Sequence, residues 1–403
     1  MALDEPKAGL EARSARAAAP PWRLVVRWIL VPILVLLSCT LRAAAGPDGF
    51  AMVNGTTTGG AGGPVVTVTN AGDFTAEINM NGPRIIQVQG PISISRVFTK
   101  SHKTIVGIGT NATLIGNLNI SGVSNVIVQN LRITSPGDQD GLTIWNAHHV
   151  WVDHCTFYDC GDGACDMNNG STHVTVSWCK FMYPTQTEHA FTMIADGFVN
   201  GGTTNYGWYT LHHNWWTAGS QQRMPASSYG RIHMYNNYFD ATNNGYCSNA
   251  RCGTEFLSEN NYYAGVKNPL YKECTGKIRA SGNMYVGTTG LTPDPGTDTV
   301  FTPPYEYELD DTALVPIIVK AWAGASGADP VFLGVQFAAG GAALELHWPT
   351  HRTGWTLQSN ATSFLDPQAW FEFPPGTGSR NTNRISVPIR VEEPTVFFRL
   401  VFP

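Results

Sequence analysis

The stretch HVWVDHCTFYDCGDGACDMNNGSTHVTVSWCKF (149–181) contains one nine-residue pattern twice. The two copies are HVWVDHCTF (149–157) and HVTVSWCKF (173–181). Both alternate β-branched or aromatic residues with polar ones, which is typical of half-buried β-strands. The stretch therefore predicts successive strands of a repeating β-structure, joined by a glycine-rich connection.

Further copies of this pattern extend the repeat in both directions. A period of roughly 23 residues, interrupted by one insertion before position 208, indicates a solenoid of β-coils rather than a sandwich. The added copies are NVIVQNLRI (125–133), WYTLHHNWW (208–216), RIHMYNNYF (231–239), EFLSENNYY (255–263) and KIRASGNMY (277–285).

One column of the aligned copies carries asparagines in register. Strands that stack lie ~4.8 Å apart, so aligned asparagines can bond side chain to side chain along the stack. The alternative is that these asparagines merely occupy turns, but four in register favour a ladder. Two cysteines of the same column would be neighbours, either as a disulfide or as two stacked buried thiols. The column reads Leu131, Cys155, Cys179, Asn214, Asn237, Asn261 and Asn283.

The N-terminus predicts export. Two arginines precede the apolar run WILVPILVLLSC (28–39), and small residues up to Ala45 follow it, which indicates a signal peptide over residues 1–45. A single membrane anchor is one alternative, although the run is short for a span. A lipoprotein anchored through Cys39 is another. We expect a secreted protein, extracellular or periplasmic.

The cysteines agree with an oxidising destination. Seven remain after the predicted cleavage, so at least one has no partner within the chain. We predict one disulfide within residues 155–179 and one within residues 247–274.

Composition and pattern divide the rest of the chain. We predict an all-β protein with a β-helix domain over 46–310, a linker over 311–329 and an accessory β-module over 330–403. The linker has a helical pattern at 313–325, and the module alternates like the strands of a small β-sandwich. A net charge of −5 gives no basic footprint for nucleic acid.

Two aspartate pairs mark a candidate metal site. Asp138 and Asp140 precede one coil strand, and Asp162 and Asp166 follow one coil later. Four like charges in one patch repel each other, and a bound cation removes that repulsion. Oxygen donors without His or Cys in the pattern suit Ca²⁺. The alternative is that these are four solvated aspartates in turns.

From about residue 65 to residue 290 the chain resembles the pectate lyases of polysaccharide lyase family one. The resemblance implies a right-handed parallel β-helix, which agrees with the repeat. The motifs that carry it are VWVDH (150–154), DGACDMNNGSTHVTVSW (162–178), TLHHNWW (210–216), RMP (223–225) and GRIHMYNNYF (230–239).

The resemblance also implies roles for individual residues. The four aspartates match the calcium ligands of the family, and Arg223 matches its catalytic arginine. The implied reaction is β-elimination on polygalacturonate, which yields 4,5-unsaturated oligogalacturonides. An arginine base must first lose a tightly held proton, so we expect an alkaline optimum. We expect the enzyme to act on pectin polysaccharide as a monomer, with Ca²⁺ as its cofactor.

The sequence departs from the family in two places. Relatives usually carry a lysine before the catalytic arginine, but there is no lysine from 181 to 266. Relatives also carry a second arginine near the position of Ser228. We predict that His189 replaces the lysine and that Arg231 partly compensates for the arginine.

Other functions stay open on the sequence alone. One alternative is a pectin lyase acting on methylated pectin, and another is a non-catalytic glycan-binding β-helix. A polygalacturonase is disfavoured, because the N-T-D, G-H-G and R-I-K signatures of those hydrolases are absent.

Overall fold

The computed structural model divides the chain into two compact units, one over residues 45–331 and one that includes residues 332–403. The predicted signal peptide, 1–45, lies outside the described residues. No helix in the described part is both long and apolar enough to cross a bilayer. The described residues are 46–185, 188–198, 206–292, 296, 298–325, 334–337, 343–347, 356–361, 368–375, 384–388 and 396–401.

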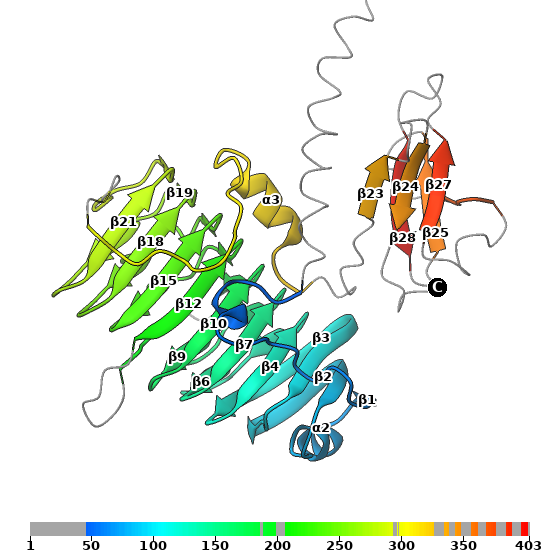
Figure 1. Ribbon diagram of the computed structural model, residues 1–403, viewed down its shortest axis with the longest axis horizontal. Coiled ribbons are helices and arrows are strands. Elements are labelled where there is room, and N and C mark those ends of the chain that lie inside the picture. The colour runs from blue at the N-terminus through cyan, green and yellow to red at the C-terminus, as the bar shows by residue number, and fades with distance from the viewer. Residues whose placement is uncertain are drawn as a thin grey trace, which may run out of the picture. The chain divides into compact units, whose positions relative to one another are not determined.

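The first unit is a solenoid of parallel strands, as the repeat predicts (Figure 1). Each coil contributes short strands to three faces of the solenoid. The first face holds β4 (Ser124–Gln129), β7 (His148–Asp153), β10 (Thr172–Ser177), β12 (Gly207–His212), β15 (Gly230–Tyr235), β18 (Glu255–Glu259) and β21 (Lys277–Ser281). The second face holds β5 (Arg132–Thr134), β8 (Thr156–Tyr158), β11 (Lys180–Met182), β13 (Trp215–Trp216), β16 (Tyr238–Phe239), β19 (Tyr262–Ala264) and β22 (Met284–Val286).

The third face carries the residues of interest for function. It holds β6 (Leu142–Trp145), β9 (Cys165–Asn168), β14 (Ala226–Ser227), β17 (Ser248–Ala250) and β20 (Leu270–Lys272). The solenoid begins with β1 (Val65–Val68) and the long strands β2 (Arg84–Phe98) and β3 (Lys103–Ser121), and β3 pairs with strands of all three faces.

Each predicted nine-residue segment forms two strands rather than one. A corner divides it, and the residue before the ladder column has a left-handed backbone. Asparagine adopts this region readily, but histidine and tryptophan do so less often, so the corner is not obvious from the sequence. The φ values are 54° at Asn130, 48° at His154, 51° at Trp178, 54° at His213, 53° at Asn236 and 48° at Asn260.

The asparagine ladder is confirmed. The Asn214 amide donates to Asn237 Oδ1 at 3.1 Å, Asn237 donates to Asn261 Oδ1 at 2.8 Å, and Asn261 donates to Asn283 Oδ1 at 3.0 Å. The same oxygens accept the backbone N–H groups of the preceding coil. The ladder therefore satisfies buried polar groups at every corner it occupies.

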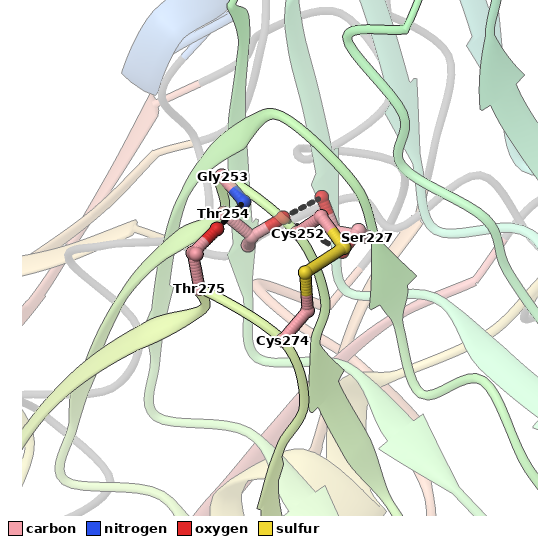
Figure 2. Close-up of a disulfide and its surroundings, with 6 residues drawn as sticks. All are labelled: Ser227, Cys252, Gly253, Thr254, Cys274 and Thr275. Carbon is pink, nitrogen blue, oxygen red and sulfur yellow. Dashed lines mark hydrogen bonds between the residues drawn. A yellow bond between two sulfur atoms is a disulfide. The ribbon is translucent and has the colours of Figure 1, made fainter.

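The prediction of a disulfide within residues 155–179 is wrong. Cys155 and Cys179 are both buried free thiols, and the Cys155 N–H points at Cys179 Sγ at 3.4 Å. The alternative of two stacked thiols therefore holds. The disulfide predicted within 247–274 is confirmed as Cys252–Cys274 (Figure 2).

Aromatic stacking fills the interior along the second face. Phe157, Phe181, Trp216, Phe239, Tyr263 and Tyr285 form a continuous row with ring centroids 4.5–5.2 Å apart. Stacked rings of this kind add to the free energy of apolar burial. This row makes successive coils hold a common register.

Segments before and after the solenoid pack on its surface. Helix α2 (Ala71–Ile78) contacts β1 and β2 and buries Phe74 and Ile78 at that end of the stack (Figure 1). The 3-10 helix η1 (Gly49–Met52) lies on the first face, where Phe50 N–H donates to Thr210 Oγ1 at 3.0 Å.

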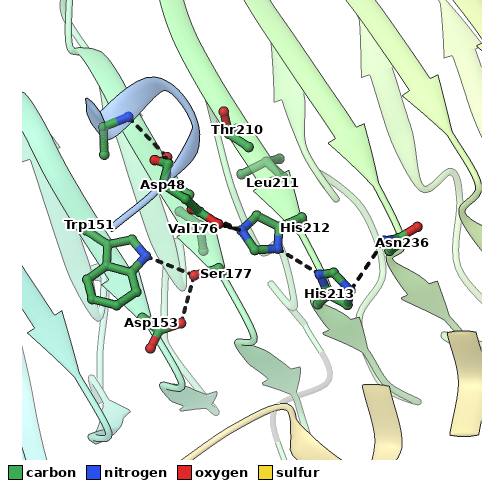
Figure 3. Close-up of polar contacts among 12 residues, drawn as sticks. Asp48, Trp151, Asp153, Val176, Ser177, Thr210, Leu211, His212, His213 and Asn236 are labelled. Carbon is green, nitrogen blue, oxygen red and sulfur yellow. Dashed lines mark hydrogen bonds and ion pairs between the residues drawn. The ribbon is translucent and has the colours of Figure 1, made fainter. Parts of the chain in front are cut away.

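A buried polar network fixes this N-terminal segment. An Asp48 oxygen lies 3.0 Å from His212 Nε2, and the two imidazoles of His212 and His213 meet at 2.7 Å (Figure 3). His213 Nε2 lies 2.9 Å from Asp310 Oδ2, in the segment between the last coil and residue 311. The histidine pair is therefore structural: it joins both flanking segments to the solenoid.

Helix α3 (Val315–Trp322) lies within the predicted linker, 311–329. Its Val315 and Val319 pack against Tyr238 of the second face, so the described part of this segment is attached to the solenoid.

Among its described residues, the second unit forms two antiparallel sheets of three strands each. One consists of β23 (Gly334–Phe337), β24 (Ala343–His347) and β27 (Arg384–Pro388), and the other of β25 (Thr356–Asn360), β26 (Phe371–Glu372) and β28 (Phe397–Val401).

Candidate functional site

Successive coils bring the predicted acidic residues and the predicted arginine to the third face. Asp140 precedes β6, Asp166 lies on β9, and Arg223 precedes β14. Asp166 pairs in register with Thr143, and the next coil pairs Ile194 with Ala226. Parallel strands lie ~4.8 Å apart, so these groups occupy neighbouring coils of one surface.

Asp140 and Asp166 approach each other closely. A Cβ added to Gly163 would lie 2.5 Å from Asp166 Oδ1 and 3.0 Å from Asp140 Oδ1. Glycine therefore leaves the space that the two carboxylates share. Burial and repulsion from Asp140 raise the pKa of Asp166 well above its usual value. Burial, with a smaller contribution from Asp162, also raises the pKa of Asp140.

Hydrogen bonds orient both carboxylates. Asp140 accepts from Thr143 Oγ1 at 2.5 Å and from Gly163 N–H at 3.1 Å, and Asp166 accepts from Ile194 N–H at 3.0 Å. These donors fix the carboxylates without neutralising their charge. The like charges therefore stay a source of repulsion in the folded chain.

The other two predicted aspartates are exposed. Asp162 Oδ1 lies 3.1 Å from His189 Nε2, although the two groups are not aligned for a hydrogen bond. His189 thus lies at the acidic patch, next to the ring of Phe191. In the described part of the chain, no contact joins Asp138 to the other three aspartates.

Arg223 has a constrained backbone and an unpaired side chain. Its φ of 61° is unusual for arginine, and strain of this kind is often found at functional sites. Its carbonyl accepts from Met193 N–H at 2.7 Å and from Thr192 Oγ1. The guanidinium lies 4.6 Å from the ring centroid of Phe191. Among the described residues, no carboxylate oxygen lies within ion-pair distance of it.

Two residues that the sequence did not single out lie beside Arg223. Burial raises the pKa of the Asp196 carboxyl, whereas the Ser228 N–H and the guanidiniums of Arg251 and Arg223 act to lower it. Asp196 and Arg251 therefore share an electrostatic environment with Arg223. Only the register of the coils reveals that Asp196 and Arg251 are near Arg223, because the insertion before β12 obscures the alignment of successive repeats in the sequence.

Arg231 lies on another face of the solenoid. It belongs to β15, and its guanidinium stacks on Tyr206 at 4.1 Å and on Trp208 at 4.6 Å. Its Nε lies 3.7 Å from Glu255 Oε2. Its predicted contact with substrate stays a prediction.

The acidic patch fits a hard divalent cation by the chemistry of its donors. Asp140, Asp162 and Asp166 supply oxygens of like charge, and two of these carboxylates are held against each other. As they stand, no three His, Cys, Asp or Glu side chains in the described ranges are arranged to hold a metal ion. Cation binding would therefore require small movements of these side chains.

Comparisons with known proteins give one consistent result. A family model described as pectate lyase matches residues 24–307. A pectate trisaccharide-lyase of Bacillus licheniformis is 34% identical over 306 residues, which cover 70% of this chain and 87% of the relative. Pectate lyase A of Emericella nidulans is 31% identical, over 68% of this chain and 85% of that protein.

Solved structures agree. The crystal structure of a Bacillus pectate lyase in complex with trigalacturonate has a TM-score of 0.61 and 27% identity, and covers 70% of this chain and 99% of its own. The family match spans the solenoid and ends before helix α3. The chain belongs to the pectate lyase family and is a polysaccharide lyase.

Proposed function

We propose that this chain is a calcium-dependent pectate lyase that cleaves α-1,4-polygalacturonate by β-elimination and leaves 4,5-unsaturated oligogalacturonides. One observation carries the proposal: the guanidinium of Arg223 has no carboxylate partner within the described residues, yet acts on the buried Asp166 carboxyl of a neighbouring coil. The relatives are named pectate lyases, and the Bacillus pectate lyase binds trigalacturonate in its crystal structure; both support the substrate class.

The four aspartates are the residues that would hold Ca²⁺. Asp140 and Asp166 are preoriented by hydrogen bonds, and Asp138 and Asp162 are exposed. When bound, the ion neutralises carboxylate charge on enzyme and substrate and makes a hydrogen beside the substrate carboxylate more acidic.

Arg223 is the proposed base. A guanidine nitrogen, in its neutral form, takes the C5 proton of a galacturonate unit. The C5–H electron pair forms the C4–C5 double bond, and the bond from C4 to the glycosidic oxygen breaks. That oxygen leaves with a proton supplied by water.

The role of His189, secretion and the monomeric state are further parts of this proposal. His189 lies at the patch, where its imidazole can donate to a substrate carboxylate. Secretion is supported by the Cys252–Cys274 disulfide, because disulfides persist in oxidising compartments. The chain is proposed to act as a monomer, which size-exclusion chromatography tests.

The test follows the ultraviolet absorbance of unsaturated ends released from polygalacturonate. We expect product with Ca²⁺, none after chelation with EDTA, and recovery when Ca²⁺ is restored. Arg223→Lys should lose roughly a hundredfold or more in rate, since a positioned base typically contributes that much. The matched control is Arg279→Lys, because Arg279 is exposed on β21 of the first face.

Three outcomes would contradict the proposal. New reducing ends without ultraviolet absorbance would indicate a hydrolase. Cleavage only of methylated pectin would indicate a pectin lyase. Binding of polygalacturonate without cleavage at any pH would indicate a glycan-binding protein.

A further inference from the structure

An aromatic residue lies on the coil between the acidic patch and Arg223. Phe191 pairs with Gly163 of the preceding coil and with Gln222 of the following coil. Parallel partners lie ~4.8 Å apart, so Phe191 stands between the coil that carries Asp166 and the coil that carries Arg223. The residue is half-buried, and the mechanism described above gives it no part.

Three consecutive residues of this coil contact Arg223. The guanidinium of Arg223 lies over the Phe191 ring, 4.6 Å from its centroid, where the π electrons of the ring attract a cation. The Arg223 carbonyl accepts from Thr192 Oγ1 and from the Met193 N–H at 2.7 Å. Residues 191–193 therefore hold both the backbone and the side chain of Arg223.

Phe191 is itself anchored. Its carbonyl accepts from Tyr183 Oη at 2.6 Å, and its N–H donates to the His189 carbonyl at 2.9 Å. The His189 ring packs against the Phe191 ring with centroids 4.1 Å apart. With its backbone bonded and its ring packed on a neighbour, Phe191 has little freedom to move away from Arg223.

The Tyr183 anchor suits a reaction in alkaline solution. Tyr183 directly follows β11 and is only 4% exposed. Burial, with smaller contributions from Cys160 and Asp166, raises the pKa of Tyr183 well above its usual value. A solvated tyrosine loses its proton near about pH 10, and with that proton it loses its hydrogen-bond donor. Tyr183 therefore still donates to Phe191 at the alkaline pH where an arginine base is expected to act.

We propose that Phe191 is the positioning residue of Arg223, whose guanidinium its ring holds in place, and that Tyr183 secures Phe191. This inference rests on the proposed function, because it names what places the proposed base. In the described part of the chain no carboxylate oxygen lies within ion-pair distance of Arg223, so the ring takes the place of an ion-pair partner. A base must be held at a defined position to take a proton, so the ring acts on the chemical step more than on substrate affinity.

The experiment measures kcat and KM for polygalacturonate in Phe191→Leu, which keeps an apolar side chain but removes the ring. We expect kcat to fall about tenfold while KM changes less than about twofold. Phe191→Tyr keeps the ring and should retain kcat within about twofold of the wild type. Tyr183→Phe deletes only the anchoring hydroxyl and should lower kcat about threefold. The matched control is Tyr158→Leu, because the Tyr158 ring lies 4.9 Å from the guanidinium of Arg132 on the second face; its kcat and KM should be those of the wild type.

The position of the Arg223 side chain separates this inference from the proposed function. In crystal structures of the variants, the guanidinium should keep its position in Phe191→Tyr and leave it in Phe191→Leu, whether or not the wild type cleaves pectate. A wild type that forms no unsaturated product refutes the proposed function alone.

Melting temperatures check that each variant is folded. An undisplaced guanidinium in folded Phe191→Leu overturns the inference, and so does a wild-type kcat in that variant. A rise in KM without a loss of kcat would assign the ring to His189 instead and would also overturn it. An equal loss of kcat in Phe191→Tyr, which keeps the ring, has the same consequence.

Discussion

Replacing Asp166 with asparagine should stabilise the cation-free protein and remove its response to Ca²⁺. Asparagine keeps the shape of the side chain and the oxygen that accepts the Ile194 N–H at 3.0 Å. It removes one of two buried like charges. Under the proposed function, the wild-type chain keeps this repulsion because the same carboxylates bind the cation.

The size of the effect follows from the shared space above Gly163. The added Cβ would lie 2.5 Å from Asp166 Oδ1 and 3.0 Å from Asp140 Oδ1, so the separation of the two oxygens cannot exceed the sum of these distances. At an effective dielectric constant of about 20, two unit charges about 5.5 Å apart repel by about 3 kcal/mol. Protonation of one carboxyl relieves part of this repulsion, so we expect a gain of about 1 to 3 kcal/mol. Such a gain raises the melting temperature by up to roughly 6 °C.

The pH dependence has a definite sign. The pKa values of Asp166 and Asp140 are raised in the folded chain, so the cation-free fold holds these protons more tightly than the unfolded chain does. Stability from this source is complete below the usual carboxyl pKa of 3.8 and is lost as pH rises above it. The melting temperature of the cation-free wild type should therefore fall more steeply with rising pH than that of Asp166→Asn.

The measurement is the melting temperature, with EDTA and with Ca²⁺, from below the usual carboxyl pKa of 3.8 upward in pH. Asp153→Asn is the matched control, because it removes a buried carboxylate with the opposite environment. Burial raises the pKa of Asp153, but His154 and the hydrogen bonds from Ser177 and Gln129 lower it further, to below its usual value. Asp153→Asn should therefore be less stable than the wild type at neutral pH, because it removes a carboxylate whose charge its neighbours stabilise. The reasoning is refuted if Asp166→Asn lowers the cation-free melting temperature, or if Ca²⁺ still stabilises it as it does the wild type.

Three further predictions concern the site and its scaffold. Gly163→Ala should abolish the stabilisation by Ca²⁺ and most lyase activity, because its methyl group would occupy the space between the Asp140 and Asp166 carboxylates. A variant that keeps both the Ca²⁺ stabilisation and the lyase activity would contradict this geometry. Cys252→Ser should lower the free energy of unfolding by about 3 kcal/mol, as expected for opening a loop of 22 residues. Denaturant unfolding with and without reductant measures this loss. A variant as stable as the oxidised wild type would count against a disulfide between Cys252 and Cys274. Asn237→Ala should cost about 3 kcal/mol or more, because it leaves the Asn214 N–H and the Leu211 carbonyl without partners; a loss below about 1 kcal/mol would argue against the ladder.

The repeat and its ladder could be predicted because each coil carries its own signal. Alternation located the strands, and four asparagines in one column predicted the ladder. The exact bend could not be read where His154 and Trp178 occupy left-handed positions, since neither residue is a usual turn residue.

The acidic patch could be predicted only in part. Spacing and resemblance singled out the four aspartates and Arg223, but not the close approach of Asp140 and Asp166 above Gly163. Arg251 was missed because it lies a full coil beyond Arg223 in the sequence and becomes its neighbour only through the stacking of coils. Both omissions arise from register, which a single sequence specifies through side-chain packing rather than through local pattern.

The central claim is that a guanidine removes a proton beside a carboxylate whose charge the acidic patch helps to neutralise. The most direct measurement is the rate of formation of unsaturated ends from polygalacturonate at saturating Ca²⁺, as a function of pH, for the wild type and Arg223→Lys. We predict a wild-type rate that rises toward alkaline pH, and a variant that binds the polymer but forms almost no product. A wild-type optimum in mild acid, or substantial product from folded Arg223→Lys, would contradict the claim.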